Sequence, residues 1–292
     1  MKAADFAYAR AASVEDAVAL LATHGDRAKL LSGGQSLLPA MNLRLISPEL
    51  IIDIGGIAEL RGIAVTGNTV RIGALTRHVD VQRSPEIAAH TPLLKEAITH
   101  VAHPAIRNRG TIGGSLAHAD PASELPACML ALDADLVVQS KSGRRRIAAG
   151  DFFQGIFQTA LSPDELLTAV ELPISAKNSA YFFYEFARRH GDYAMAGLAA
   201  QAVIEGGILA DLRLAYFAVG DRPVLAGTAN KLTAKTITPA LLSEASRALG
   251  DELDPQDDQQ ASGVMRRHLA QVLLRRCVAA LLSRPELVRA TA

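Results

Sequence analysis

LLSGGQSLLPAMNLRL, residues 30–45, and IRNRGTIGGSLAHADPASELPA, residues 106–127, are the two stretches that decide the fold of this chain. Each contains a Gly-Gly pair with a serine close behind it. Successive backbone N–H groups in such a turn can point the same way, and glycine lets an anion approach without a Cβ in its path. Ser32, Gln35, Ser36, Thr111 and Ser115 add neutral hydrogen-bonding groups. No lysine lies within either loop, so the pair suits a pyrophosphate held mainly by backbone dipoles.

A Gly-Gly pair is also typical of a plain turn. Both stretches are interpreted as a strand followed by Gly-Gly and serine, and this repetition is what favours an anion site over two unrelated turns. Neither stretch has the G-x-x-x-x-G-K-[ST] pattern of a P-loop, and neither has the G-x-G-x-x-G pattern of a dinucleotide-binding fold. A classical nucleotide site of either kind is therefore disfavoured.

The sequence around the two loops predicts alternating helices and strands. Ser13 caps a helix that Gly25 ends, and Gly67-Asn68 is typical of a hairpin turn. Further helices are expected at 92–103 and 121–132, and strands at 29–31, 50–54, 63–72, 135–139 and 167–172.

A second domain is expected after the polar segment 173–179. Strands are predicted at 181–187, 199–205 and 209–219, with Gly206-Gly207 as a tight turn, followed by helices from residue 239 and a long helix over 262–282. The last few residues are expected to fray. The chain thus divides into 1–176 and 177–292.

Composition excludes several classes of protein. The 292 residues carry 30 Lys and Arg against 30 Asp and Glu, which argues against a nucleic-acid partner. Aromatic residues make up 4% and Trp is absent, so a base-stacking platform is disfavoured. Cys128 and Cys277 are too few for a cysteine-bound iron–sulfur cluster or zinc site. Without a signal peptide or a long apolar run, the sequence indicates a cytoplasmic protein with no membrane span.

The two loops, together with RRHGDYAMAG at residues 188–197, strongly resemble the FAD-binding (medium) subunit of molybdenum hydroxylases, the carbon monoxide dehydrogenase and xanthine dehydrogenase family. The resemblance covers essentially the whole chain. It implies an α+β fold that begins with a vanillyl-alcohol-oxidase (PCMH)-type FAD-binding domain of two α/β subdomains, about 1–56 and 57–176. A C-terminal domain of the CO dehydrogenase flavoprotein type, 177–292, would follow, with a three-stranded antiparallel sheet and helices.

The resemblance also implies which residues bind non-covalent FAD. The loops would close on the pyrophosphate from both sides, Ser123 and Glu124 would bind the adenosine and ribityl region, and Tyr193 would lie over the isoalloxazine ring. The implied set is Lys29, Leu30, Leu31, Ser32, Gly33, Gly34, Gln35, Ser36, Leu37, Val101, Ala102, Thr111, Gly114, Ser115, Ala117, Ser123, Glu124, Leu161 and Tyr193. No catalytic side chain and no metal ligand is expected.

Several of these residues have a simpler explanation. Leu37, Val101 and Leu161 fit an ordinary core, and Glu124 fits a first-turn acid that complements a helix dipole. Tyr193 fits a half-buried aromatic residue. Asp120 resembles an acid of the family's second loop, and no role is assigned to it.

The function implied is that of an electron-transfer oxidoreductase subunit. Molybdopterin would lie on a large partner subunit and [2Fe-2S] clusters on a small one, in a dimer of heterotrimers, and electrons would pass through FAD to an external acceptor. One alternative is a stand-alone FAD-dependent reductase or oxidase of the same fold. Another is a non-enzymatic relative that keeps the fold without the flavin. Neither substrate nor acceptor can be named.

Overall fold

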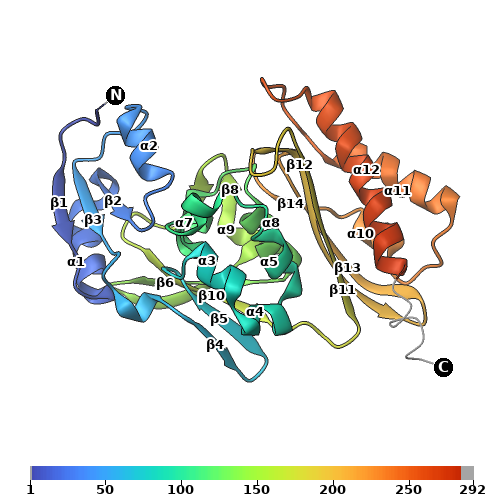
Figure 1. The fold of residues 1–292 in the computed structure, drawn as a ribbon, viewed down its shortest axis with the longest axis horizontal. Coiled ribbons are helices and arrows are strands. Elements are labelled where there is room, and N and C mark those ends of the chain that lie inside the picture. Colours follow the sequence, from blue (N-terminus) through green and yellow to red (C-terminus); the bar gives the residue numbers. More distant parts are fainter. Residues whose placement is uncertain (1, 284–292) are drawn as a thin grey trace.

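The computed structural model describes residues 2–283, so the expectation about the chain's last residues lies outside the described part. Three sheet-containing parts stand in a row, in the order of the sequence (Figure 1). The first part holds the parallel strands β1 (Ala7–Arg10), β3 (Leu50–Asp53) and β2 (Ala28–Leu31), in that order across the sheet. Helices α1 (Val14–His24) and α2 (Leu37–Asn42) belong to it, with short 3₁₀ turns at Gly25–Arg27 and Ala58–Leu60.

Helix α1 begins and ends where the sequence predicts. The Ser13 hydroxyl accepts from the Asp16 N–H, and the Asp16 carboxylate accepts from the Ala12 N–H, which satisfies two amides that the first turn leaves unpaired. Gly25 follows the helix with φ +52°, a conformation that favours glycine.

The middle part is built on a five-stranded antiparallel sheet in the order β4-β5-β10-β6-β7. Its strands are β4 (Ile63–Thr66), β5 (Thr69–Gly73), β6 (Asp135–Ser140), β7 (Gly143–Ala148) and β10 (Leu166–Pro173), and a small hairpin is formed by β8 (Phe153–Gly155) and β9 (Gln158–Thr159). Its helices are α3 (His78–Arg83), α4 (Pro85–His90), α5 (Pro92–Ala97), α6 (Pro104–Arg107), α7 (Ile112–His118), α8 (Glu124–Ala131) and α9 (Ala149–Phe152).

The third part is an antiparallel sheet with helices packed on both faces. It contains β11 (Ser179–Ala187), β12 (Ala194–Glu205), β13 (Ile208–Phe217) and β14 (Val224–Leu225). Helices α11 (Pro239–Glu252) and α12 (Gly263–Leu282) cover its outer side, with the short α10 (Ala229–Leu232) before them, while α5 and α8 contact its inner side (Figure 1). The expected three strands are present, with β14 as a short fourth.

Helix α8 joins the middle part to the third part. All eight of its residues are buried, which is why its sequence is apolar all round, and it contacts β12, β13 and α5. Cys128 on α8 and Cys277 on α12 are both buried and free, as expected of small apolar residues, and burial raises the pKa of each thiol.

Three sequence predictions fail at their boundaries. The helix expected over 92–103 ends at Ala97, after which the backbone forms tighter turns in which the Thr99 and His100 N–H groups donate to the carbonyl oxygens of Glu96 and Ala97. Ala102, with φ +45°, and Pro104 disfavour helical geometry beyond these turns. The helix expected over 121–132 begins only at Glu124, after a left-handed Ala119. The second loop follows helix α6 instead of a strand, and its Gly-Gly pair lies in the first turns of α7.

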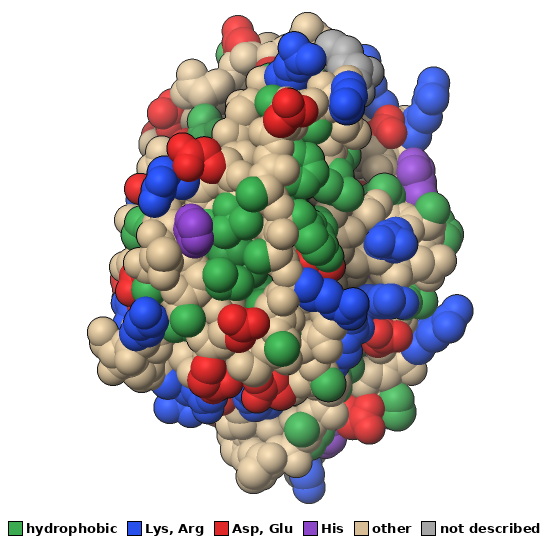
Figure 2. Space-filling view, turned by 90° about the vertical axis from the view of Figure 1, so that its left-hand side faces the viewer, with side chains coloured by type: hydrophobic (Ala, Val, Ile, Leu, Met, Phe, Trp, Pro, Cys, Tyr) green, Lys and Arg blue, Asp and Glu red, His purple; other side chains and the backbone are tan. Residues whose placement is uncertain are grey.

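The face of the molecule drawn in Figure 2 carries side chains of both charges. Figure 2 shows Lys and Arg side chains and Asp and Glu side chains on the same face, around a group of hydrophobic side chains near its centre. No helix among residues 2–283 combines the length and hydrophobicity needed to cross a membrane.

Candidate functional site

The two glycine-rich loops, 75 residues or more apart in sequence, meet in the structure. The Ser32 and Thr111 hydroxyls share a hydrogen bond with an Oγ–Oγ1 distance of 2.7 Å, across a separation of 79 residues. A Cβ on Gly33 would lie only 2.3 Å from the Arg109 carbonyl oxygen, so the two backbones touch at a point where no other residue fits. The sequence-based expectation that both loops face one another is therefore supported by direct contacts.

The first loop presents a run of unused donors. The backbone N–H groups of Gly33, Gly34, Gln35 and Ser36 donate no hydrogen bond to any residue that the structure describes. Gly34 has φ +72°, and the Gln35 side-chain amide donates to the Gly33 carbonyl oxygen at 2.9 Å, which holds the turn in shape. Consecutive free amides around a left-handed residue form the kind of concave surface that binds an anion.

The second loop is held by its own cap. The Thr111 hydroxyl accepts from the Gly114 N–H at 3.1 Å while it bonds Ser32, so one side chain both starts α7 and ties the loops together. Gly114 packs closely against this pair. A Cβ at this position would lie 2.8 Å from Thr111 Oγ1 and 3.7 Å from Ser32 Oγ, so glycine is the residue that fits without a shift. The site thus combines the Ser32–Thr111 hydroxyl pair with the neighbouring backbone N–H groups of residues 33–36.

Sequence reasoning missed His78, which supports the second loop from behind. Its Nε2 lies 3.0 Å from the Ser115 Oγ, and a Cβ on Gly110 would lie 2.9 Å from the imidazole ring. Burial lowers the pKa of His78 to about 4, so the ring is neutral at pH 7. The sequence places His78 near the loops, but it assigns this residue no role, because isolated histidines in loops are usually neither ligands nor bases.

Arg107 shapes a second wall of the site. This buried guanidinium donates through Nη1 to the carbonyl oxygens of Val101 and Ala102, at 2.9 and 3.0 Å. The Ala102 carbonyl also lies against Gly191, where a Cβ would be 2.7 Å away and where φ is +85°. The segment before the second loop is therefore packed against the start of the third part.

Glu124 and Tyr193 come from different parts of the chain toward the same region. Burial and the neighbouring Glu185 carboxyl raise the pKa of Glu124 to about 8, so at pH 7 it is mostly protonated and can donate as well as accept. Partial burial of the phenol and the nearby Asp120 and Glu124 carboxyls raise the pKa of Tyr193. Tyr193 as a whole residue is 63% exposed, so it is not part of the core and can contact a ligand.

Other predicted residues have plainer surroundings. Val101 is buried and Leu161 is partly buried, and both belong to or pack against the main core. Lys29, Leu30 and Leu31 lie on or at the end of β2, which leads into the first loop, with Lys29 exposed. Leu37 begins α2, Ala117 is on an exposed side of α7, and Ser123 precedes α8. No described contact joins these residues across the two loops.

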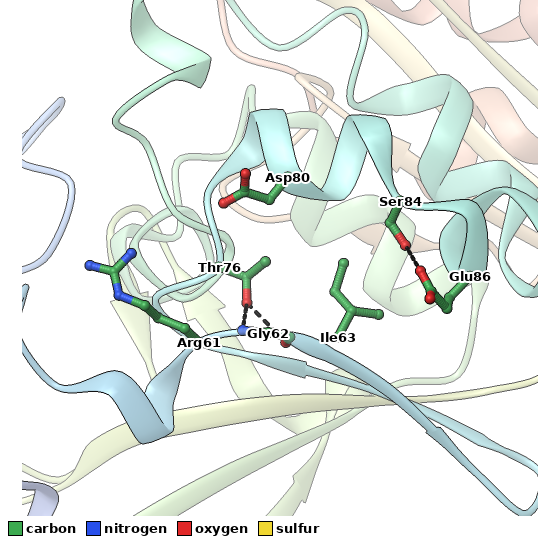
Figure 3. Close-up of a pocket in the computed structure, with 7 residues that line it drawn as sticks. All are labelled: Arg61, Gly62, Ile63, Thr76, Asp80, Ser84 and Glu86. Atoms are coloured by element: carbon green, nitrogen blue, oxygen red, sulfur yellow. Dashed lines mark hydrogen bonds between the residues drawn. The ribbon is translucent and has the colours of Figure 1, made fainter.

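A separate cavity of about 270 Å³ lies between β4 and helices α3 and α4 (Figure 3). Its polar groups already bond one another: Thr76 Oγ1 bonds both backbone polar groups of Gly62, and Ser84 donates to Glu86 at 2.6 Å. None of its lining residues belongs to the predicted set, so this cavity is not part of the candidate site.

Comparison with known proteins agrees with this arrangement. Residues 4–175 match the family model described as "FAD binding domain in molybdopterin dehydrogenase", and residues 181–281 match "CO dehydrogenase flavoprotein C-terminal domain". Two relatives from Paenarthrobacter nicotinovorans are each 40% identical. They are the nicotine 6-hydroxylase medium subunit, over 95% of this chain and 98% of the relative, and the 6-hydroxypseudooxynicotine dehydrogenase complex subunit alpha, over 97% of each. A carbon monoxide dehydrogenase structure from Hydrogenophaga pseudoflava superimposes with a TM-score of 0.95 at 37% identity, covering 97% of this chain and 99% of the other.

An FAD-binding domain followed by this C-terminal domain defines a flavoprotein subunit of an oxidoreductase. The chain belongs to the family of FAD-binding medium subunits of molybdenum hydroxylases, which confirms the resemblance seen in its loops. The α+β fold expected from that resemblance is confirmed as well.

The neutral, buried state of His78 predicts a pH effect on stability. The unfolded chain binds a proton near pH 6.5, while the folded chain resists it until about pH 4, so the free energy of unfolding falls as pH decreases between these values. The full difference corresponds to about 3 kcal/mol. We expect His78→Gln to lose less stability than the wild type between pH 6.5 and pH 4, measured by urea unfolding. His268→Gln, at an exposed histidine, serves as the control; equal pH dependence in all three proteins would contradict this account.

Proposed function

We propose that this chain is the electron-transfer subunit of a molybdenum hydroxylase complex, with FAD held non-covalently between its two glycine-rich loops. The observation that carries the proposal is the contact between the loops, with a run of free backbone N–H groups beside the Ser32–Thr111 hydroxyl pair. These groups fit a pyrophosphate, because they offer donors and residues 32–36 contain no carboxylate that would repel it. When bound, FAD accepts electrons from the complex and delivers them to an external acceptor.

The remaining residues would each perform a limited task. Val101 and Ala102, fixed by Arg107, would form a wall of the flavin pocket, with Leu161 as an apolar contact. Glu124, protonated near neutral pH, could bind a ribityl or ribose hydroxyl as donor or acceptor. Tyr193 would cover one face of the isoalloxazine ring. Lys29, Leu30, Leu31, Leu37, Ala117 and Ser123 would complete the cofactor contacts.

No residue of the chain is proposed to hold FAD covalently. Both cysteines are fully buried in α8 and α12. We further propose a domain division at residues 176 and 177, which the ends of the two matched regions, at 175 and 181, support. The partners would be a large molybdopterin-binding subunit and a small [2Fe-2S] subunit, in a dimer of heterotrimers located in the cytoplasm. The relatives act on different compounds, so no substrate is assigned.

We expect Gly114→Asp to lower the affinity for FAD at least tenfold, or about 1.4 kcal/mol. The added carboxylate would repel a pyrophosphate, and its Cβ would press on the Thr111 hydroxyl that links the loops. Titration of the apoprotein with FAD, followed by flavin fluorescence, measures the affinity. Gly150→Asp is the matched control, because nothing lies within 4 Å of a Cβ at that position. Full FAD occupancy in Gly114→Asp would disprove the pyrophosphate assignment.

Assembly distinguishes a complex from a stand-alone flavin enzyme. We expect the chain, tagged at its natural level in the cells that produce it, to co-purify with two further subunits and with stoichiometric iron and molybdenum. The chain itself has too few cysteines to supply an iron–sulfur cluster, so the metal must come with partners. Native mass measurement and metal analysis check this. A free 30.9 kDa flavoprotein with neither metal would favour the stand-alone alternative.

Tyr193 tests how the flavin edge is shielded. We expect Tyr193→Ala to keep FAD bound, because the loops hold the pyrophosphate, and to alter flavin fluorescence through loss of an aromatic contact of about 0.5–1.5 kcal/mol. Reoxidation of the reduced flavin by oxygen or a dye should become faster as one ring face opens. Tyr184→Ala, at another exposed tyrosine, is the control. Spectra and stopped-flow rates identical to wild type would mean that Tyr193 has no contact with the ring.

A further inference from the structure

A second cavity, of about 520 Å³, opens between α3, α5 and α6 and has an unbalanced charge. Three cationic side chains line it, Arg83 from α3, Lys95 from α5 and Arg107 from α6. None of its lining residues is an aspartate or glutamate, and none belongs to the predicted FAD-binding set. We name this space the α3–α6 pocket.

The charges in the α3–α6 pocket are not neutralised within the described part of the chain. Neither Arg83, Lys95 nor Arg107 takes part in an ion pair among residues 2–283. Lys95 donates to the Gln82 carbonyl oxygen, which is a neutral acceptor.

Arg107 is the cation of this pocket whose lack of a counter-charge costs the most free energy, because its side chain is buried. Its side chain is buried, with the residue only 9% exposed, and its partners are the Gln82 amide oxygen and backbone carbonyls, all of them neutral. Its Nη2 donates no hydrogen bond to a described residue. A buried cation without a counter-charge costs free energy, which a bound anion would recover.

The cavity of Figure 3, which also borders α3, is lined by side chains of both charges. Asp80 lines the cavity of Figure 3 together with Glu86 and Arg61, where both signs are present. Arg83, one turn further along the same helix, lines the α3–α6 pocket instead. An anion would therefore meet carboxylates in the cavity of Figure 3, whereas every charged side chain that lines the α3–α6 pocket is a cation.

The remaining lining residues indicate the size and chemistry of the ligand. Gln82, Thr99 and Asn108 add neutral hydrogen-bonding groups, while Val79 and Pro104 supply apolar walls. A volume of about 520 Å³ falls within the range of small-molecule sites and exceeds what a bare phosphate needs. We propose that the α3–α6 pocket binds a phosphorylated small molecule, with its phosphate among Arg83, Lys95 and Arg107 and its uncharged part against Val79 and Pro104.

Calorimetry on the chain saturated with FAD tests this proposal. The probes are ribose 5-phosphate and inorganic phosphate, each at constant ionic strength, with ribose as the uncharged comparison. We expect saturable one-to-one binding of ribose 5-phosphate, weaker binding of phosphate and none of ribose. Arg83→Gln and Lys95→Gln should each weaken binding at least tenfold, and the double variant should abolish it. Neither residue belongs to the FAD set, so flavin content should stay unchanged.

Arg144→Gln is the control, because Arg144 is an exposed cation on β7 that bonds Gln139 outside the pocket. It should bind ribose 5-phosphate as the wild type does. Absence of saturable binding in the wild type, undiminished binding in the double variant, or equal displacement by chloride at matched ionic strength would each overturn the proposal. The same titrations on the chain without FAD test binding to the α3–α6 pocket even if the chain does not bind FAD between its loops. A failure of this proposal can therefore be distinguished from a failure of the proposed function.

Discussion

The contact between Gly33 and the backbone of Arg109 is the constraint on which the rest of the site depends. No side chain fits between these loops, because a Cβ would lie 2.3 Å from a carbonyl oxygen. That approach brings the Ser32 and Thr111 hydroxyls to 2.7 Å, and the backbone N–H groups of the first loop donate no hydrogen bond to any described residue. Once the loops are joined, the first and middle parts of the chain form two sides of one site, although their sheets share no strand.

Two buried side chains, His78 and Arg107, support the second loop and the segment before it through hydrogen bonds. His78 supports Ser115 and packs on Gly110, and Arg107 holds the carbonyls of Val101 and Ala102. His78 lies outside the glycine-rich stretch 106–127, and Arg107 lies at its beginning. Neither residue is expected to contact the cofactor. A site that binds its ligand through backbone N–H groups needs such support. Glycine-rich loops have high conformational freedom, and contacts with neighbouring residues must restrict it before the N–H groups are held in position.

The sequence predicted much of this arrangement, and its failures have physical causes. Strong local signals, such as the Ser13 cap and the Gly206-Gly207 turn, placed α1 and the β12–β13 hairpin correctly. Two predicted helices were too long, and left-handed alanines lie near both: Ala102 follows the turns after α5, and Ala119 precedes α8 by five residues. Alanine gives no sign of this backbone conformation in the sequence. The supporting roles of His78 and Arg107 could not be predicted, because they arise from contacts with residues distant in the sequence or from burial.

The third part of the chain contacts the candidate site at two places, Gly191 and the sheet face that packs on helix α8. Gly191 packs against the Ala102 carbonyl with φ +85°, and this places Tyr193, two residues later, beside Asp120 and Glu124. Helix α8 provides Glu124 at its start and is buried against β12 and β13 along its length. A movement of the third sheet relative to the loops would therefore shift Tyr193 and Glu124 together while the Ser32–Thr111 contact stayed intact. The architecture thus separates the groups proposed to hold the pyrophosphate from those proposed to surround the flavin's reactive end.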